Sequence, residues 1–230
     1  MLVTHPDIQI RAQLLGAERA PLLIIDNVVA DPGRLVRKAS HHGFSRQGAM
    51  FPGVRAQAPF SYREFLQTLL QPLLQPYFGL EAGRFEFPMC HYSLVTTPPS
   101  QLKFLQKVPH IDSTDGSGLA TVHYLFDGWG GTAFYRHRQT GFEYIDEARG
   151  RPYFQCLEQQ SHQPDATGEG YINGDSALFE QIARVDGVFN RMLVYRRNSL
   201  HSGCIDNRQV PTADPLAGRL SINSFIDVVR

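Results

Sequence analysis

The first 80 residues combine one apolar run with two stretches of helical spacing. The run at 22–25 is short and is followed by Asp-Asn, which predicts a buried strand. At 31–39, an Asp-Pro pair suited to a helix start precedes apolar residues at helical spacing. At 62–74, apolar residues recur at i, i+3 and i+4, which predicts a second helix that ends near two prolines. The Gly-, Pro- and Gln-rich segment 43–59 is expected to be a loop.

After residue 79 the pattern changes to short runs rich in β-branched and aromatic residues. Strands are predicted at 85–95, 119–126, 131–135, 191–195 and 219–229. The segment 139–186 is less regular, and in it we expect a helix at 175–183 and a polar loop at 161–170. Helices followed by many short strands predict an α+β chain, mainly β, built on an antiparallel double-sheet barrel.

The same change of pattern predicts the domain organisation. A chain of 230 residues suits one domain, and we expect residues 1–230 to form it. Residues 1–80 would be a mainly helical N-terminal support. Residues 81–230 would form the β core, with an insertion around 139–187.

Charge and cysteine content narrow the possible partners and environment. Lys+Arg and Asp+Glu both number 22, so the zero net charge gives no electrostatic reason to expect nucleic acid or an anionic membrane as partner. Cys90, Cys156 and Cys204 are widely spaced and odd in number, which favours a reducing compartment over a disulfide framework. The longest apolar run is far too short to span a bilayer and no signal-peptide pattern is present, so we expect a cytoplasmic protein.

Two motifs can bring three metal ligands together. His110 and Asp112 are separated by one residue, and such residues point to the same side of an extended chain. His201 follows the strand predicted at 191–195 and can complete the set from a neighbouring strand. Two imidazoles and one carboxylate on one face of an octahedral ion leave the other positions open, as in non-haem Fe(II) oxygenases. The sequence therefore predicts a catalytic iron site of His110, Asp112 and His201.

The start of the last predicted strand carries a candidate site for a dicarboxylic acid. A 2-oxoglutarate molecule would chelate iron through its 2-oxo group and C1 carboxylate, and its far carboxylate would need a permanently charged partner. Arg219 suits this because its planar guanidinium matches a carboxylate in two hydrogen bonds. Ser221, two residues on, points the same way and can add a hydroxyl donor. Arg208, in the preceding segment 206–218, is an alternative partner for that carboxylate.

In this order the motifs resemble a known family. The matching segments are His110-Ile-Asp112, Tyr124-Leu-Phe-Asp, Gly130-Gly-Thr-Ala-Phe, His201-Ser-Gly and Arg219-Leu-Ser221. They resemble the Fe(II)/2-oxoglutarate-dependent dioxygenase superfamily, in its prolyl-4-hydroxylase-like branch, over roughly residues 87–229. The run 131–137 resembles a bacterial subgroup of that superfamily whose function is unassigned. Segments 139–187 and 206–218 are longer than the usual pattern.

The resemblance implies a double-stranded β-helix, the jelly-roll core of cupin-like proteins, with the N-terminal helices packed on it. The residues that it implies are the iron ligands His110, Asp112 and His201, and the 2-oxoglutarate-binding residues Arg219, Ser221 and Tyr124. With Fe(II), 2-oxoglutarate and O2, such an enzyme would hydroxylate its substrate and release succinate and CO2. The presence of Asp112 speaks against halogenation, because related halogenases bind chloride in place of that carboxylate.

Other histidines are candidate ligands or substrate contacts. His123 lies in the strand predicted at 119–126 and points away from the tyrosine that follows it, so we expect a structural role. Arg136 and His137 follow the Gly-Gly turn and could line the mouth of the barrel and contact substrate. His91 is a further candidate ligand.

Two alternative functions stay open at this point. A cupin-like metalloprotein would bind metal without 2-oxoglutarate, and the segment 219–221 argues against it. A catalytically silent interaction module on the same fold is the second alternative, and the intact ligand set argues against that. The substrate could be a small molecule or a protein side chain, and no charge pattern selects between them or indicates an oligomeric state.

Overall fold

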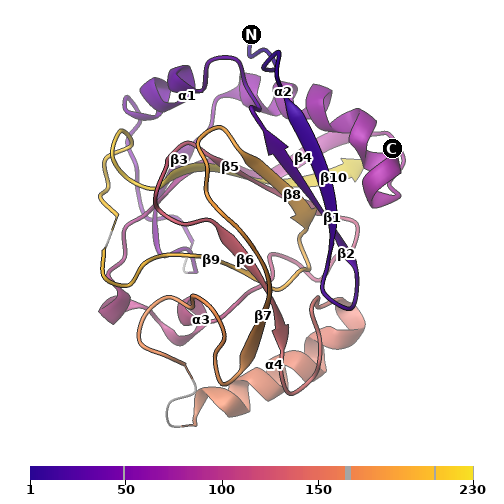
Figure 1. Cartoon of the computed structure of the whole chain (residues 1–230), viewed down its shortest axis with the longest axis vertical. Coiled ribbons are helices and arrows are strands. Elements are labelled where there is room, and N and C mark those ends of the chain that lie inside the picture. Colours follow the sequence, from indigo (N-terminus) through magenta and orange to yellow (C-terminus); the bar gives the residue numbers. More distant parts are fainter. Residues whose placement is uncertain (49, 164–166, 210, 230) are drawn as a thin grey trace.

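Two antiparallel β-sheets form the centre of the molecule (Figure 1). The computed structural model describes residues 1–48, 50–163, 167–209 and 211–229. In spatial order, the larger sheet contains β1 (Gln9–Leu15), β2 (Ala20–Asp26), β8 (Met192–Arg196), β5 (Leu119–Tyr124), β10 (Leu220–Val229), β4 (Arg84–Val95) and β3 (Gly53–Gln57). The smaller sheet contains β7 (Phe179–Val185), β6 (Thr132–His137) and β9 (His201–Gly203). All strand pairings within the described ranges are antiparallel.

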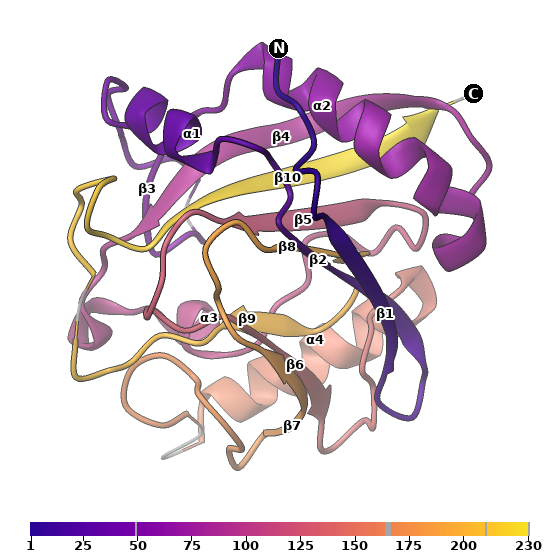
Figure 2. The same ribbon diagram turned by 45° about the horizontal axis from the view of Figure 1, so that its top comes forward.

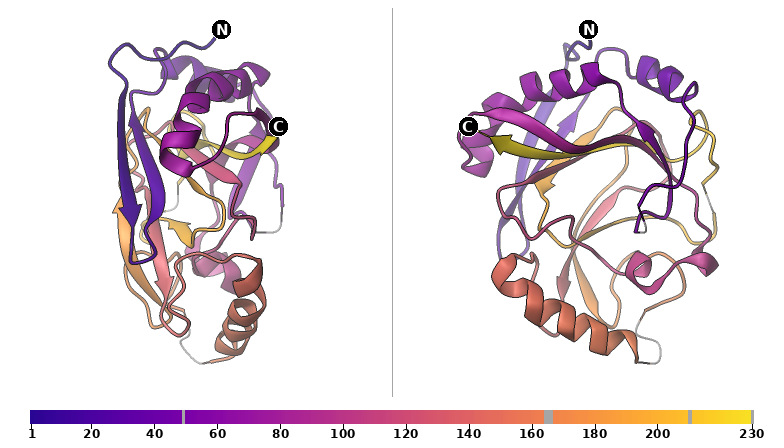
Figure 3. Two further views of the ribbon diagram at one scale, coloured as in Figure 1. Left: turned by 90° about the vertical axis from the view of Figure 1, so that its right-hand side faces the viewer. Right: turned by 180° about the vertical axis from the view of Figure 1, so that it is seen from behind.

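Helices cover the outer faces of both sheets, so the molecule is layered (Figures 2 and 3). Helices α1 (Pro32–Ala39) and α2 (Phe60–Leu70) lie over the larger sheet, and α4 (Glu147–Ser161) lies over the smaller one. The remaining short helical segments are Gln71–Leu73, Leu74–Phe78, Pro99–Gln101 and α3 (Phe104–Lys107). The inner faces of the two sheets therefore face each other, and a cavity lies between them.

Buried apolar clusters follow the same layers. Leu35 of α1 and Ile222 of β10 belong to the cluster that joins the helices to the larger sheet. Tyr153 of α4 and Phe179 of β7 belong to the cluster beneath the smaller sheet. A third cluster, which includes Tyr195 of β8 and side chains of β6, lies between the sheets.

The two-residue alternation of strands decides which side chains face inward. In β6, Phe134 belongs to the cluster between the sheets, whereas Ala133 and Tyr135 pack toward α4. In β10, Asn223 faces the cavity between the sheets, whereas Ile222 packs toward α1 and α2. A one-residue slip in either strand would therefore exchange the polar lining with the core.

Most of the predicted elements are present. The helix predicted at 31–39 is α1, and the Asp31 carboxylate caps it by accepting a hydrogen bond from the Arg34 amide at 3.0 Å. The helix predicted at 62–74 is α2, whose regular geometry ends at Leu70, just before Pro72. The strands predicted at 22–25, 85–95, 119–126, 131–135, 191–195 and 219–229 are β2, β4, β5, β6, β8 and β10.

Two predictions in the less regular segments are wrong, the loop at 43–59 and the helix at 175–183. The segment 43–59, expected to be a loop, contains β3, and its residue 49 lies outside the described residues. The helix expected at 175–183 is absent, and β7 occupies Phe179–Val185. A register shift between Phe134 and Tyr135 places an extra residue of β7 opposite β6, which hides the alternation of β7. Helix α4 lies where only irregular structure was expected, and residues 164–166 of the expected loop at 161–170 lie outside the described residues.

The architecture is mixed α/β with mainly antiparallel strands, as the sequence predicted. Residues 1–80 supply α1 and α2, but they also supply β1, β2 and β3, which extend both edges of the larger sheet. The description of this region as a helical support was therefore incomplete. Among the described residues, no helix is both long and apolar enough to cross a membrane.

Candidate metal centre

His110 and His201 are brought together by a short stretch of β pairing. The His110 amide donates to the His201 carbonyl at 2.9 Å, and the His201 amide donates to the His110 carbonyl at 3.0 Å. Residues that exchange both bonds in an antiparallel pair carry their side chains on the same face. The two imidazole rings accordingly lie with their centroids 4.4 Å apart.

Asp112 completes the cluster from the same extended segment as His110. Its amide donates to the Arg197 carbonyl at 2.8 Å, which fixes the segment against the end of β8. One Asp112 carboxylate oxygen lies 3.7 Å from His110 Nε2 and the other lies 3.6 Å from His201 Nε2. One ligand atom from each of the three residues lies within 4.8 Å of the other two. The sequence-predicted ligands therefore converge on a single point.

The protonation of His201 is set by its backbone surroundings. Its Nδ1 lies 2.9 Å from the Ser199 carbonyl, which can only accept a hydrogen bond, so Nδ1 carries the proton. The Nε2 lone pair is then free to face Asp112 and His110. A histidine oriented through its second nitrogen in this way is typical of metal ligands.

The surroundings of His110 favour its neutral form. Enclosure by the surrounding chain lowers the pKa of His110 below its usual range, although 47% of its side chain is exposed; Arg55, and His201 whenever its ring is protonated, act in the same direction. Burial raises the pKa of Asp112, while His201 and Arg55 act in the opposite direction. Neutral imidazole is the form that binds a metal ion. The donor set therefore fits a divalent transition metal.

The cluster lines a cavity of about 370 Å³ between the two sheets. Only three of the described residues that line it carry a permanent charge at neutral pH, and they are Asp112, Arg55 and Arg219. The rest of the lining is largely apolar or aromatic. A mainly apolar cavity with a few convergent polar groups is the usual form of a small-molecule site.

Arg219 is buried in this cavity without a carboxylate partner among the described residues. Only 5% of the residue is exposed. Its Nη2 donates to the Gly131 carbonyl at 2.8 Å and its Nε donates to the Trp129 carbonyl at 3.3 Å. The guanidinium carbon lies 4.9 Å from the centroid of the Phe126 ring. These contacts orient the guanidinium but leave its positive charge uncompensated, so the site is suited to an anion.

Ser221 and Tyr124, the other two residues predicted to bind 2-oxoglutarate, do not line the cavity but are hydrogen-bonded to residues that do. The Ser221 hydroxyl donates to the Asn223 amide oxygen at 2.8 Å, and the Tyr124 hydroxyl lies 2.7 Å from the Thr132 hydroxyl. Asn223 and Thr132 line the cavity, whereas Ser221 and Tyr124 are fully buried beside it. Burial raises the pKa of Tyr124 above its usual range, so its hydroxyl stays protonated.

Arg208, the alternative carboxylate partner, lies outside the cavity. Its side chain is 88% exposed and pairs with Asp206 at 2.8 Å. A solvated arginine that already has a carboxylate partner adds little to ligand binding. The geometry therefore favours Arg219 over Arg208.

The remaining histidines considered as ligands or substrate contacts lie elsewhere. His123 is buried among structural partners, with Nδ1 2.9 Å from the Tyr62 hydroxyl. His137 is bonded to Thr140 and Gln160 beneath the smaller sheet. Arg136 pairs with Glu143 and Glu180. The interpretation of Arg136 and His137 as lining the mouth of the cavity is therefore wrong, because their side chains bond to other parts of the protein. His91 is half-buried on β4 and is not part of the three-residue cluster.

Most residues that line the cavity were not predicted from the sequence, and two of them lie where they could act on a ligand. Tyr195 of β8 stacks edge-on against the His201 ring, at 4.8 Å between centroids, and its hydroxyl makes no hydrogen bond to the described residues. Its place six residues before His201 on an apolar strand was a signal that could have identified it. Arg55 of β3 also lines the cavity, and it lies in a segment that the sequence presented as a loop.

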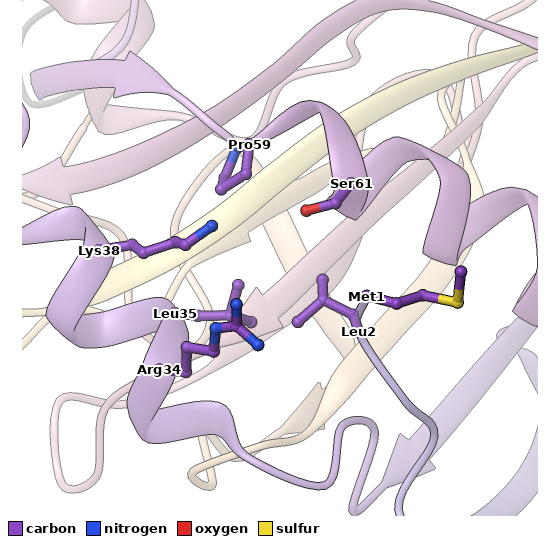
Figure 4. A pocket seen from close by; sticks show the side chains of 7 residues that line it. All are labelled: Met1, Leu2, Arg34, Leu35, Lys38, Pro59 and Ser61. Atoms are coloured by element: carbon purple, nitrogen blue, oxygen red, sulfur yellow. The ribbon is translucent and has the colours of Figure 1, made fainter.

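A second hollow lies far from the cluster, between α1, α2 and the N-terminal residues (Figure 4). Figure 4 shows Arg34 and Lys38 of α1 beside it, together with Pro59 and Ser61. Its volume is about 10 Å³, enough for roughly one water molecule. It cannot hold a substrate.

Comparison with known proteins identifies both a family and a fold. The model of a family described as "Family of unknown function (DUF6445)" matches residues 6–226. No curated protein matches the chain. The non-heme alpha ketoglutarate dependent epimerase SnoN from nogalamycin biosynthesis has a similar structure, with a TM-score of 0.52 and 13% identity, over 91% of this chain and 79% of SnoN. HygX from Streptomyces hygroscopicus, solved with nickel and 2-oxoglutarate bound, also has a similar structure. Its TM-score is 0.51 and its sequence identity is 11%, over 90% of this chain and 83% of HygX. At these identities the likeness shows a shared fold.

Proposed function

The chain belongs to the DUF6445 family, whose function is unknown, and we propose from its cavity that it is an Fe(II)- and 2-oxoglutarate-dependent oxygenase. One observation carries the proposal. The cavity that contains the His110, Asp112 and His201 cluster also contains Arg219, a buried cation without a carboxylate partner in the described chain. Two neighbours in fold are named for 2-oxoglutarate or hold it, which supports the same assignment.

The residues present fit both cofactors. His110, Asp112 and His201 would hold iron on one face and leave other positions for ligands. Arg219 would bind the far carboxylate of 2-oxoglutarate through its two outer N–H groups, supported by Ser221 and Tyr124 through Asn223 and Thr132. When bound, Fe(II) and 2-oxoglutarate would supply the oxidising chemistry with O2, with succinate and CO2 as products.

This chain's own residues would prepare the site for that chemistry. The Ser199 carbonyl keeps the His201 Nε2 free of a proton, and the Arg197 carbonyl holds the Asp112 segment in place. Tyr195 and the aromatic cluster behind it exclude water from one wall of the cavity. We propose hydroxylation as the outcome, and Asp112 argues against halogenation. SnoN is an epimerase, so product analysis has to distinguish oxygen insertion from a change of stereochemistry.

We further propose that the two facing sheets form a double-stranded β-helix of the prolyl-4-hydroxylase-like branch. The antiparallel pairing and the place of the ligands between the sheets support this. Segment 139–187 is then an elaboration that adds α4 and β7 to the smaller sheet, within one domain. We also propose that the protein is cytoplasmic and does not bind nucleic acid. Its primary substrate is not identified by the fold.

An anaerobic titration of metal-free protein tests the central claim. Fe(II) followed by 2-oxoglutarate should produce a visible metal-to-ligand charge-transfer band that neither component gives alone. Asp112→Ala should abolish the band. Iron binding without a band would favour a cupin-like metalloprotein instead, and failure to bind iron would refute the proposal. In air, the wild-type protein should convert 2-oxoglutarate to succinate.

A further inference from the structure

A second arginine lines the same cavity as Arg219. Arg55 projects from β3, the edge strand of the larger sheet, and its guanidinium carbon lies 4.1 Å from the centroid of the Phe51 ring. Its Nε is buried and has no hydrogen-bond partner, and Arg55 forms no ion pair with any described carboxylate. The guanidinium is held in place by stacking, and Asp112 attracts it without forming an ion pair, so among the described residues the metal-binding carboxylate is its one acidic neighbour in the cavity.

Strand register places the two arginines two strands apart on the larger sheet. Arg55 lies opposite Ser93 of β4, and Ser93 lies opposite Ser221 of β10. Two strand spacings therefore separate Arg55 from Ser221, about 10 Å. Arg219 bonds to the Gly131 carbonyl, on the side where β6 begins. Both arginines thus enter the cavity from the larger sheet, two strands apart, and the metal-binding cluster lines the same cavity.

The charges of the proposed loaded site leave Arg55 without a counterion. A doubly charged metal ion, the Asp112 carboxylate, doubly charged 2-oxoglutarate and Arg219 sum to zero. Arg55 is the only other permanently charged side chain among the described residues that line the cavity. A partly buried cation next to a neutral centre favours one further negative charge.

The walls of the cavity indicate the rest of the ligand. Phe51, Met50, Met89 and Leu105 line the cavity and offer apolar surface. Asn223 also lines it, and one end of its amide stays free after its bond to Ser221. Apolar walls with one cation and one amide fit a compact molecule with an apolar body and a single anionic group.

We propose that Arg55 binds a carboxylate of the primary substrate, so that this protein acts on a small apolar carboxylic acid. The inference rests on the proposed function, because it assigns Arg219 to 2-oxoglutarate. Arg55 is then a substrate-binding residue that holds the carboxylate of the acid in the cavity. A neutral analogue of the same shape would leave the guanidinium desolvated and unpaired, so it should bind more weakly.

Binding of acid and amide pairs tests this directly. Protein loaded with Ni(II), a redox-inert substitute for Fe(II), and 2-oxoglutarate is titrated calorimetrically with 4-phenylbutyrate and with 4-phenylbutyramide, and then with 3-phenylpropionate and its amide. Each acid should bind at least about tenfold more tightly than its amide. Arg55→Gln should remove the preference and Arg55→Lys should keep part of it. The control is Arg84→Gln, which replaces an exposed arginine at the first position of β4 and should leave the preference for the acid unchanged.

The outcomes separate this inference from the proposed function. Equal binding of acid and amide, no binding of either acid, or a preference that persists in Arg55→Gln overturns the assignment of Arg55. A loss of 2-oxoglutarate affinity in Arg55→Gln also overturns it, because Arg55 would then belong to the cosubstrate. If wild-type protein binds no 2-oxoglutarate, the proposed function fails. In that case an Arg55-dependent preference for the acid in metal-free protein would still support an acid-binding site.

Discussion

At the scale of single residues, Arg219 is the hardest to explain without an anionic ligand. Removing a guanidinium from water is costly, and two backbone carbonyls and an aromatic face recover only part of that cost. Natural proteins rarely bury arginine unless it is paired. An incoming carboxylate would complete the missing pair, and the burial of Arg219 therefore prepares the site for binding.

Replacing Arg219 should weaken 2-oxoglutarate binding selectively. Arg219→Gln removes a charged bond worth about 1.5–3 kcal/mol, so the Kd of 2-oxoglutarate should rise by roughly 10- to 150-fold. The affinity for Ni(II) alone should change little, because Arg219 is not one of the three ligands. Calorimetric titration measures both constants. Arg208→Gln is the matched control, and a similar loss in that exposed variant would contradict the assignment.

At the scale of elements, the Gly130-Gly131 turn joins the site to the smaller sheet. The Gly131 carbonyl accepts from Arg219, and the turn leads directly into β6. A Cβ atom on Gly131 would collide with the Val185 carbonyl, and one on Gly130 would collide with the Cys204 carbonyl. Gly130 also has φ of +74°, which favours glycine. The two glycines therefore allow the close approach that places the carbonyls around Arg219.

Gly131→Ala should damage stability and cosubstrate binding together. Relieving the collision requires β6 and β7 to move apart, and we expect a loss of about 1–3 kcal/mol in the free energy of unfolding. The same shift should raise the Kd of 2-oxoglutarate. Urea unfolding and calorimetry measure the two effects. Gly43→Ala, where a Cβ meets open space, should change neither. A destabilised Gly131→Ala protein with normal 2-oxoglutarate affinity would show that the turn does not position Arg219 for cosubstrate binding.

Glu143 joins the β1–β2 hairpin to the smaller sheet. Its carboxylate accepts hydrogen bonds from the Ala17 and Glu18 amides of the hairpin turn, at 3.0 and 2.9 Å, and pairs with Arg136 of β6. Burial alone would raise the pKa of Glu143, but these hydrogen bonds outweigh burial and hold the pKa below its usual value. The ionised carboxylate therefore favours the folded state.

The contribution of Glu143 to stability should depend on pH. Because its pKa is lowered by folding, the contribution is present above the unfolded pKa of about 4.3 and is lost as pH falls through the folded value. At neutral pH, Glu143→Gln should lower the free energy of unfolding by about 1–3 kcal/mol. Urea unfolding of both proteins from pH 7 down to pH 3 should show the difference shrinking at acid pH. A difference that grows as the pH falls would show that the stabilisation has another source.

At the scale of the whole molecule, the candidate site joins separate parts of the chain. His201 lies on the smaller sheet, Asp112 is fixed against the end of β8 in the larger sheet, and Arg219 lies at the start of β10. A ligand that contacts all of them binds only the folded state. Its binding energy therefore adds to the stability of the complete fold.

Metal binding should consequently stabilise the whole molecule. With free Ni(II) at 100 times its Kd, the free energy of unfolding should rise by about 2.7 kcal/mol, which thermal unfolding detects as a higher Tm. Asp112→Ala should lose this stabilisation, because it removes one of the three ligands. Asp115→Ala is the control, since that carboxylate lies three residues on and does not line the cavity. Equal stabilisation of both variants would place the metal elsewhere.

The sequence predicted the parts of this molecule that follow local rules. Asp31 and Pro32 predicted the start of α1, and the His110-Ile-Asp112 spacing predicted two side chains on one face. Long-range pairing explains what was missed. The pairing of β7 with β6 contains a register shift, which local alternation does not predict. Arg55 reaches the cavity only because β3 pairs with β4 at the edge of the larger sheet. Glu143 is separated by 125 residues from the Glu18 amide that it accepts from, and no local pattern reveals such a contact.

The position of β10 has a consequence for synthesis of the protein on the ribosome. β10 lies between β5 and β4, yet it is translated after every other strand of its sheet. Until it leaves the exit tunnel, the sheet consists of two separate halves, and the nascent chain exposes the edges where β10 will insert. Closure of the sheet and delivery of Arg219 to the cavity are therefore one late event. A nascent chain arrested before Leu220 should remain open to proteases and to chaperones that bind exposed strand edges.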